Sequence, residues 1–116
     1  MIRRGEIYLV NVGKQYNSQF GKIRPALIIQ NNLANRVLDK VHFKGVTVIP
    51  LTTNLVGGRL RVQIEARDQL KQTSEICINE LCTLDLSRIQ QNLVLTRLQQ
   101  DEITEVEQKL RQHLAL

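Results

Sequence analysis

Two stretches of this chain, 6–12 and 59–66, alternate apolar and polar residues with a period of two, and its last segment changes to a helical period. The alternation is strictest in RLRVQIEA, where Leu60, Val62 and Ile64 fall on one face of an extended chain. Further short stretches rich in strand-forming residues occupy 6–12, 24–30, 46–53, 75–86 and 92–98. This pattern predicts five to seven short strands that pack as a small, mostly β barrel or sandwich.

The segment 99–116 has the period of an amphipathic helix. Its apolar stripe consists of Ile103, Val106, Leu110 and Leu114. We expect this stripe to dock on the barrel. Acidic side chains lie in the first turn and basic ones near the end, as the helix dipole favours. One further helical turn is expected within the polar segment 31–45.

Two glycines and two prolines constrain how the strands connect. Gly57 and Gly58 form a turn, which predicts a hairpin between the strand that precedes them and the strand that follows. Pro25 and Pro50 lack the backbone N–H that a strand ladder needs. We therefore expect each proline near the start of a strand, on an unpaired edge or at a bulge.

Composition is that of a globular protein rather than a disordered or membrane-spanning one. By length the 116 residues form a single domain, 1–116, and 42% of them are hydrophobic and 23% charged. No apolar run is long enough to span a membrane, and the first residues lack the features of a signal peptide, so we expect a cytoplasmic location and no membrane contact. The net charge of +5 favours a polyanionic partner such as nucleic acid.

The sequence has none of the common motifs for nucleotide binding, zinc-dependent hydrolysis or a serine nucleophile. Its two cysteines, Cys77 and Cys82, lie far in sequence from either histidine and are too few for a four-ligand zinc site. We therefore expect buried, reduced thiols, and neither a metal nor a cofactor.

Four ordered motifs resemble the MazF/Kid/PemK-type toxins of type II bacterial toxin–antitoxin systems. They are RRGEIYLVNVG, GKIRPALIIQNN, VTVIPLTTNL and CTLDLSRI, and together they extend over nearly the whole chain. The resemblance implies an SH3-like small barrel of about five to seven antiparallel strands with a C-terminal α-helix. It also implies a cytoplasmic homodimer that is controlled by a cognate, MazE-like antitoxin.

Members of that family are mostly endoribonucleases, also called mRNA interferases. The resemblance therefore implies cleavage of single-stranded RNA at a short sequence without a metal. The ribose 2′-OH attacks the adjacent phosphorus, which leaves a 2′,3′-cyclic phosphate and a 5′-OH. Such a reaction needs a base for the 2′-OH, donors for the phosphoryl oxygens and a route for a proton to the leaving 5′-oxygen.

The family's catalytic arginine and threonine match Arg24 and Thr52 of this chain. A guanidinium stays charged and offers a fixed fork of donors, so Arg24 is suited to stabilise the phosphoryl oxygens. The hydroxyl of Thr52 can donate a hydrogen bond but cannot act as a base at neutral pH. The residues that we expect to contact RNA are Lys14, Tyr16, Ser18, Gln19, Phe20, Lys22, Thr53, Arg59 and Glu80, with Arg61 as a further basic residue on the same rim.

The chain departs from the family pattern in two places. Many members carry a glutamate and a glutamine before the arginine, where this chain has Gln19 and Phe20. An amide has no useful basicity, whereas an aromatic ring offers a platform for base stacking. Farther along, Asn79, Glu80 and Cys82 stand where glutamate, glutamine and arginine are expected.

These departures leave three interpretations open for the chemistry. The RNA preference has changed while the chemistry is intact, a different base such as Glu80 or Asp85 serves instead, or the chain binds RNA without cutting it. A further alternative is a gyrase inhibitor of the CcdB type, which shares the fold and has no nuclease activity. The C-terminal sequence RQHLAL lacks the Trp-Gly-Ile-like ending that would favour that alternative.

Overall fold

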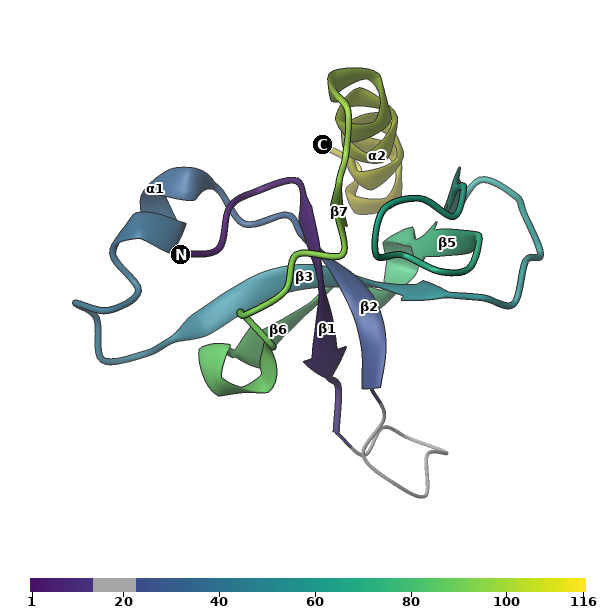
Figure 1. Ribbon diagram of the computed structural model, residues 1–116. Coiled ribbons are helices and arrows are strands. Elements are labelled where there is room, and N and C mark those ends of the chain that lie inside the picture. Colours follow the sequence, from purple (N-terminus) through teal and green to yellow (C-terminus); the bar gives the residue numbers. More distant parts are fainter. Residues whose placement is uncertain (14–22) are drawn as a thin grey trace.

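The computed structural model describes residues 1–13 and 23–116 (Figure 1). Its strands are β1 (Glu6–Asn11), β2 (Ile23–Ile28), β3 (Gly45–Thr52), β4 (Arg61–Ile64), β5 (Ser74–Cys77), β6 (Cys82–Asp85) and β7 (Thr96–Arg97). Its helices are α1 (Asn32–Arg36) and α2 (Gln100–Leu114), with single 3₁₀ turns η1 (Ile78–Glu80) and η2 (Leu86–Arg88). The predicted fold class is confirmed: a mostly antiparallel β half-barrel that ends in a helix. Neither α1 nor α2 is long and apolar enough to cross a membrane.

Strand β3 is the centre of the half-barrel. The strand order is β4-β5-β3-β2-β1-β7, with β6 paired to β3 as well, and all pairings are antiparallel. The first half of β3 pairs with β6, and its end pairs with β5. In Figure 1, β3 runs from the side of α1 toward β5. The two ends of β3 therefore belong to different surroundings, which matters for the site.

The predicted hairpin between the strands on either side of Gly57 and Gly58 is wrong. Strand β5 lies between β3 and β4, because Ile76 pairs with Leu51 on one side and with Val62 on the other. The connection from β3 to β4 is a loop rather than a tight turn. Backbone N–H groups of this loop donate hydrogen bonds to the side chain of Glu75 on β5, and the loop does not join two paired strands.

The two prolines lie where the physical rule requires them. At Pro25, β2 pairs with β1, whereas its ladder to β3 begins only at Ala26. At Pro50, one edge of β3 pairs with β2. On the opposite edge, the ladder to β6 ends at Val48 and the ladder to β5 begins at Leu51, so among the described residues Pro50 has no partner there. At each proline the strand is therefore paired along one edge only, which is where a residue without an N–H is tolerated.

Alternation along β3 divides the core into two apolar clusters. Val46 and Val48 belong to the cluster that includes Ala26 and Ile28, which we call the lower cluster. The upper cluster contains Ile7, Leu27, Ile49, Leu51, Val62, Ile64 and Ile76, with Val106 of α2. Each fully buried side chain of this size contributes about 1.5–3 kcal/mol through removal of apolar surface from water.

Helix α2 covers the upper cluster through most of its predicted stripe. Val106 is fully buried, and Ile103 and Leu110 pack against the same cluster while partly exposed. Leu114 is 46% exposed, so the expectation that it docks is wrong. Leu114 is the last residue of α2, and the chain turns into a left-handed conformation at Ala115 directly after it.

An ion pair fixes the start of α2 to the loop before β5. Arg67 donates from Nη1 to Oε2 of Glu102 at 2.7 Å and from Nη2 to Oε1 at 2.8 Å. Glu102 Oε1 also accepts from the backbone N–H of Gln99 at 2.8 Å, which completes a capping box. The hydrogen bond from Arg67 holds the pKa of Glu102 below its usual range.

Glu102→Ala is expected to lower the free energy of unfolding by about 2 kcal/mol, because it removes a helix cap together with a bidentate ion pair. Urea denaturation at neutral pH measures the change. Glu105→Ala is the matched control, since Glu105 reaches Lys109 only at 3.9 Å within the helix, and its loss should cost less than about 0.5 kcal/mol. Equal losses in the two variants would contradict the role given to Glu102.

Candidate active site

Polar side chains continue the face of the lower cluster beyond its apolar residues. The β2–β3 ladder ends at the pair of Ala26 with Pro50, and Arg24 and Thr52 each lie two residues beyond that pair. Because side chains alternate, Arg24 lies on the face of Ala26, and Thr52 lies on the face of Val48. Alternation and the observed strand pairing together thus place a guanidinium and a hydroxyl on one face at the β5 end of β3.

Arg24 is held rather than free in solvent. Its Nε donates to the carbonyl oxygen of Leu51 at 2.9 Å, which is the peptide group leading into Thr52. Its Nη1 donates to Oε1 of Glu80 at 2.9 Å, and its Nη2 faces Sγ of Cys77 at 3.8 Å. The side chain is 16% exposed. One N–H on each terminal nitrogen has no partner among the described residues, and two such donors match two phosphoryl oxygens.

Thr52 is the last residue of β3 and is half-buried. Its Oγ1 accepts a hydrogen bond from the backbone N–H of Asn54 at 3.2 Å. That hydrogen bond fixes the position of Oγ1, and the hydroxyl hydrogen of Thr52 can still donate to a ligand. Thr53 follows directly and is exposed.

Glu80 joins Arg24 from the 3₁₀ turn between β5 and β6. Its side chain is 43% exposed. The turn is anchored by fully buried Ile78, whose backbone N–H donates to the carbonyl of Leu60 at 2.9 Å. The sequence analysis placed Glu80 among the RNA contacts, and in the structure this carboxylate is bonded to the predicted catalytic arginine.

The two cysteines flank the turn that carries Glu80. Cys77 is fully buried and Cys82 is half-buried, and both thiols are free. Burial raises the pKa of each thiol, and the nearby charge of Glu80 adds to the rise. The thiols are therefore protonated at neutral pH, as a pair of structural cysteines would be.

Asp85, the other carboxylate considered as a base, lies far from this cluster. It pairs with Gly45 at the opposite end of β3 and caps η2 by accepting from the backbone N–H of Ser87 at 2.9 Å. An eight-residue strand spans about 25 Å at roughly 3.3 Å per residue. The register thus separates Asp85 from Arg24 and leaves Glu80 beside it.

A buried carboxylate, Glu75, was missed by the sequence analysis. It lies on β5 opposite Thr52 and is 3% exposed. Oε1 accepts from the backbone N–H of Val56 at 3.0 Å, and Oε2 accepts from that of Gly57 at 3.0 Å. These bonds, that of Val56 foremost, hold the pKa of Glu75 below its usual range, and the nearby cation of Arg61 adds to the effect. Glu75 thus fixes the loop that follows Thr52.

Arg61 does not form part of a free basic rim, contrary to expectation. Its Nη1 donates to Oε1 of Glu75 at 3.0 Å and to the carbonyl of Asn54 at 3.3 Å. A buried carboxylate needs a cation beside it, and Arg61 supplies one. The sequence did contain a signal for this ion pair, because Glu75 is a charged residue within the buried strand β5. Its partner, Arg61, could not be identified because it lies on another strand.

Arg59 lies apart from the Arg24 cluster, beside the end of α2. It is exposed and lines a hollow of about 310 Å³ together with Leu60, Lys109, Gln112 and His113. Lys109 in that hollow donates to the backbone carbonyl of Arg61 at 3.0 Å. The predicted contact of Arg59 with RNA stays a prediction.

Six of the predicted RNA contacts lie outside the described residues. They are Lys14, Tyr16, Ser18, Gln19, Phe20 and Lys22. Their proposed roles stay predictions based on the sequence.

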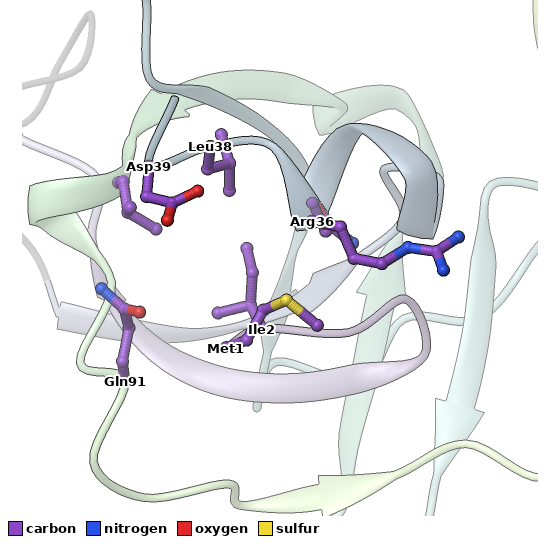
Figure 2. A pocket seen from close by; sticks show the side chains of 8 residues that line it. Met1, Ile2, Arg36, Leu38, Asp39 and Gln91 are labelled. Atoms are coloured by element: carbon purple, nitrogen blue, oxygen red, sulfur yellow. The ribbon is translucent and has the colours of Figure 1, made fainter. Parts of the chain in front are cut away.

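A different hollow of about 230 Å³ lies near the other end of β3, between the N-terminus and α1 (Figure 2). Its lining residues are Met1, Ile2, Asn35, Arg36, Leu38, Asp39, Leu86 and Gln91. Figure 2 shows that the guanidinium of Arg36 points away from the other labelled side chains. The lining also includes the carboxylate of Asp39. No predicted site residue lines this hollow.

Within residues 1–13 and 23–116, no three His, Cys, Asp or Glu side chains come together in a way that could hold a metal ion. The side chains of the Arg24 cluster bring together a guanidinium, hydroxyls, an exposed carboxylate and two thiols.

Comparison with known proteins relates this chain to a family. Residues 3–114 match the family described as PemK-like, MazF-like toxin of type II toxin-antitoxin system. The Endoribonuclease MazF of Staphylococcus epidermidis is 29% identical over 113 residues, which cover 95% of this chain and 88% of that protein.

Solved structures show the same fold. MazF from Deinococcus radiodurans superimposes with a TM-score of 0.77 at 22% identity, covering 99% of this chain and 97% of that one. A mycobacterial endoribonuclease, solved in complex with its cognate antitoxin, gives a TM-score of 0.76 at 22% identity, covering 100% of this chain and 97% of that one.

Proposed function

Because the chain belongs to the PemK-like, MazF-like toxin family of type II toxin–antitoxin systems, we propose that it is an endoribonuclease that cleaves single-stranded RNA without a metal. The observation that supports the proposal is that Arg24 and Thr52 each lie two residues beyond the Ala26–Pro50 pair, with the guanidinium bound to the carbonyl of Leu51 and to Glu80. Donors that are fixed before the substrate arrives stabilise charge without a cost of reorganisation at the moment of reaction.

In this mechanism the scissile phosphate lies against the two remaining N–H groups of Arg24. The hydroxyl of Thr52 donates to the same phosphoryl group. The 2′-oxygen forms a bond to phosphorus as the bond from phosphorus to the 5′-oxygen breaks. A water molecule supplies the proton for the 5′-oxygen, and the products are a 2′,3′-cyclic phosphate and a 5′-OH. Arg24 and Thr52 stabilise the negative charge that accumulates on the phosphoryl oxygens.

A homodimer and a cognate MazE-like antitoxin belong to the same proposal. The mycobacterial endoribonuclease of the same fold was solved with its antitoxin. The net charge of +5 is suited to an acidic segment that folds on binding.

Incubation of the purified protein with a long RNA in the presence of EDTA tests the function. We expect cuts at a short motif, and fragments whose new ends carry a 5′-OH. RNA that stays intact at a large excess of protein would overturn the proposal. A gel shift of that intact RNA would then indicate binding without cutting, which Gln19 favours, and inhibition of gyrase supercoiling would indicate the CcdB-type alternative.

Thr52→Val is expected to lower the cleavage rate about ten- to a hundredfold, because a hydrogen bond to a charged phosphoryl oxygen contributes about 1.5–3 kcal/mol. Valine has nearly the same shape, so the fold should be retained. The matched control is Thr83→Val, since Thr83 is an exposed residue of β6 paired with Thr47 in the half of β3 away from the site. Single-turnover rates on one short RNA measure the effect, and equal rates for the two variants would remove Thr52 from the mechanism.

A further inference from the structure

The proposed reaction needs a group that accepts the proton of the attacking 2′-OH, and neither Arg24 nor Thr52 can be that group. We propose that Glu80 is this general base, an inference that rests on the proposed function. It assigns to Glu80 a contact with the reacting atoms rather than with RNA in general.

Other carboxylates and thiols near Arg24 are unsuited to the task. Both oxygens of Glu75 accept hydrogen bonds from backbone and Arg61 donors, and the side chain is buried. Asp85 lies at the other end of β3 and caps η2. The thiols of Cys77 and Cys82 have raised pKa values and stay protonated.

Glu80 has the geometry that a base in this position requires. Oε1 accepts from Arg24 at 2.9 Å, the thiol of Cys77 is a second hydrogen-bond donor to the carboxylate, and the side chain is still 43% exposed. The side chain is accessible, whereas the turn that carries it is anchored by buried Ile78. A fixed backbone with an accessible carboxylate oxygen is suited to proton transfer.

The guanidinium connects the carboxylate with the substrate. A phosphate on the remaining N–H groups of Arg24 lies beside Glu80, and the 2′-OH is joined to the same ribose as that phosphate. Oε2 of Glu80 takes the proton of the 2′-OH while the bond from the 2′-oxygen to phosphorus forms. The bond from phosphorus to the 5′-oxygen breaks, and water protonates that oxygen. Glu80 then releases its proton to solvent, so the protein is unchanged after one turnover.

The charged and titratable groups around Glu80 come from several elements. They are Arg24 of β2, Cys77 of β5 and Cys82 of β6, with Arg61 of β4 paired to Cys77, and helix α2 packs against η1. None of these changes its charge between neutral and mildly acid pH. If the cleavage rate of the parent falls at acid pH and this fall is absent when Glu80 is replaced, the fall is therefore due to Glu80.

Paired substitutions distinguish a base from a positioning residue. Glu80→Gln keeps an oxygen that accepts from Arg24, whereas Glu80→Ala removes it. We expect both variants to cut about 10²–10⁴ times more slowly than the parent, as loss of a general base does. Near-parental cutting by Glu80→Gln, with a loss only in Glu80→Ala, would overturn the proposal in favour of positioning. Faster cutting by Glu80→Gln would overturn it too, since Glu80 would then shield Arg24.

Three further measurements accompany the rates. An RNA with a 2′-deoxy nucleotide at the cut site should bind to the parent and to Glu80→Gln with Kd values within about threefold, and lost binding would overturn the base role. The acid-side loss of rate should be present in the parent and absent in Glu80→Gln. Formate should restore part of the rate of Glu80→Ala, whereas it should not affect the parent.

The control variant is Glu105→Gln, which removes the same charge from the exposed face of α2 and should cut at the parental rate. The parent itself separates the two proposals. If the parent does not cut RNA, the proposed function fails. If the parent cuts and Glu80→Gln cuts equally well, the function stands and the assignment of the base fails.

Discussion

Arg24→Ala is expected to lower the rate of RNA cleavage by about a thousandfold while the protein remains folded. The substitution removes the charged donors that face the phosphoryl group, and a single such donor contributes about a hundred- to thousandfold. It also leaves the carbonyl of Leu51 and the carboxylate of Glu80 without their partner. Single-turnover cleavage of a short RNA measures the loss.

Two variants sharpen that result. Arg24→Lys keeps the charge but has no planar fork, so it cannot bind Leu51, Glu80 and a phosphate together, and we expect it to remain strongly impaired. Arg36→Ala removes the same positive charge from α1, at the other end of β3, and should cut normally. Arg24→Ala should cost about 1–2 kcal/mol of stability, so rates are compared where both proteins are folded. Parental cutting by Arg24→Ala would place the active site elsewhere.

The resemblance to the family singled out Arg24 and Thr52, and alternation combined with the pairing of Ala26 with Pro50 places their side chains on one face. A strand places every second side chain on one face, so the number of residues from Arg24 to Ala26 and from Pro50 to Thr52 determines that both lie on the same face. The helical period of 99–116 likewise predicted α2 and its burial at Val106. Faces and periods are local properties, and local properties can be read from sequence.

The neighbour of each strand could not be read in the same way. Alternation does not say whether β3 pairs with β4 or with β5, because both candidates present one apolar face. In the structure, the carboxylate of Glu75 on β5 bonds both the backbone of the loop after β3 and the cation of Arg61 on β4. Such contacts join residues distant in sequence. For the same reason, the sequence left Glu80 and Asp85 as equal candidates, and only the register along β3 separated them.

The loop after Thr52 depends on Glu75, and Glu75→Gln tests this dependence. All the groups that Glu75 meets are donors: the backbone N–H groups of Val56 and Gly57, and Nη1 of Arg61. Glutamine has one acceptor oxygen, so in either orientation its NH₂ faces a donor and Arg61 loses its counter-charge. We expect a clear drop in the urea midpoint of unfolding. We also expect a cleavage rate about a hundredfold lower, as a displaced reacting group would give.

Acid pH should lower the stability of the parent protein in the same way, because protonation removes the charge of Glu75. The folded pKa of Glu75 is lowered from its usual value, so the stability that Glu75 contributes is complete above that value and is lost as the pH falls through the lowered one. The difference in urea midpoint between the parent and Glu75→Gln should therefore be largest at neutral pH and shrink as the pH falls below about 4.3, the usual glutamate pKa. Glu65→Gln is the matched control, because Glu65 is an exposed glutamate just after β4. A difference that is the same at pH 7 and pH 3.5 would mean that the charge of Glu75 does not hold the loop.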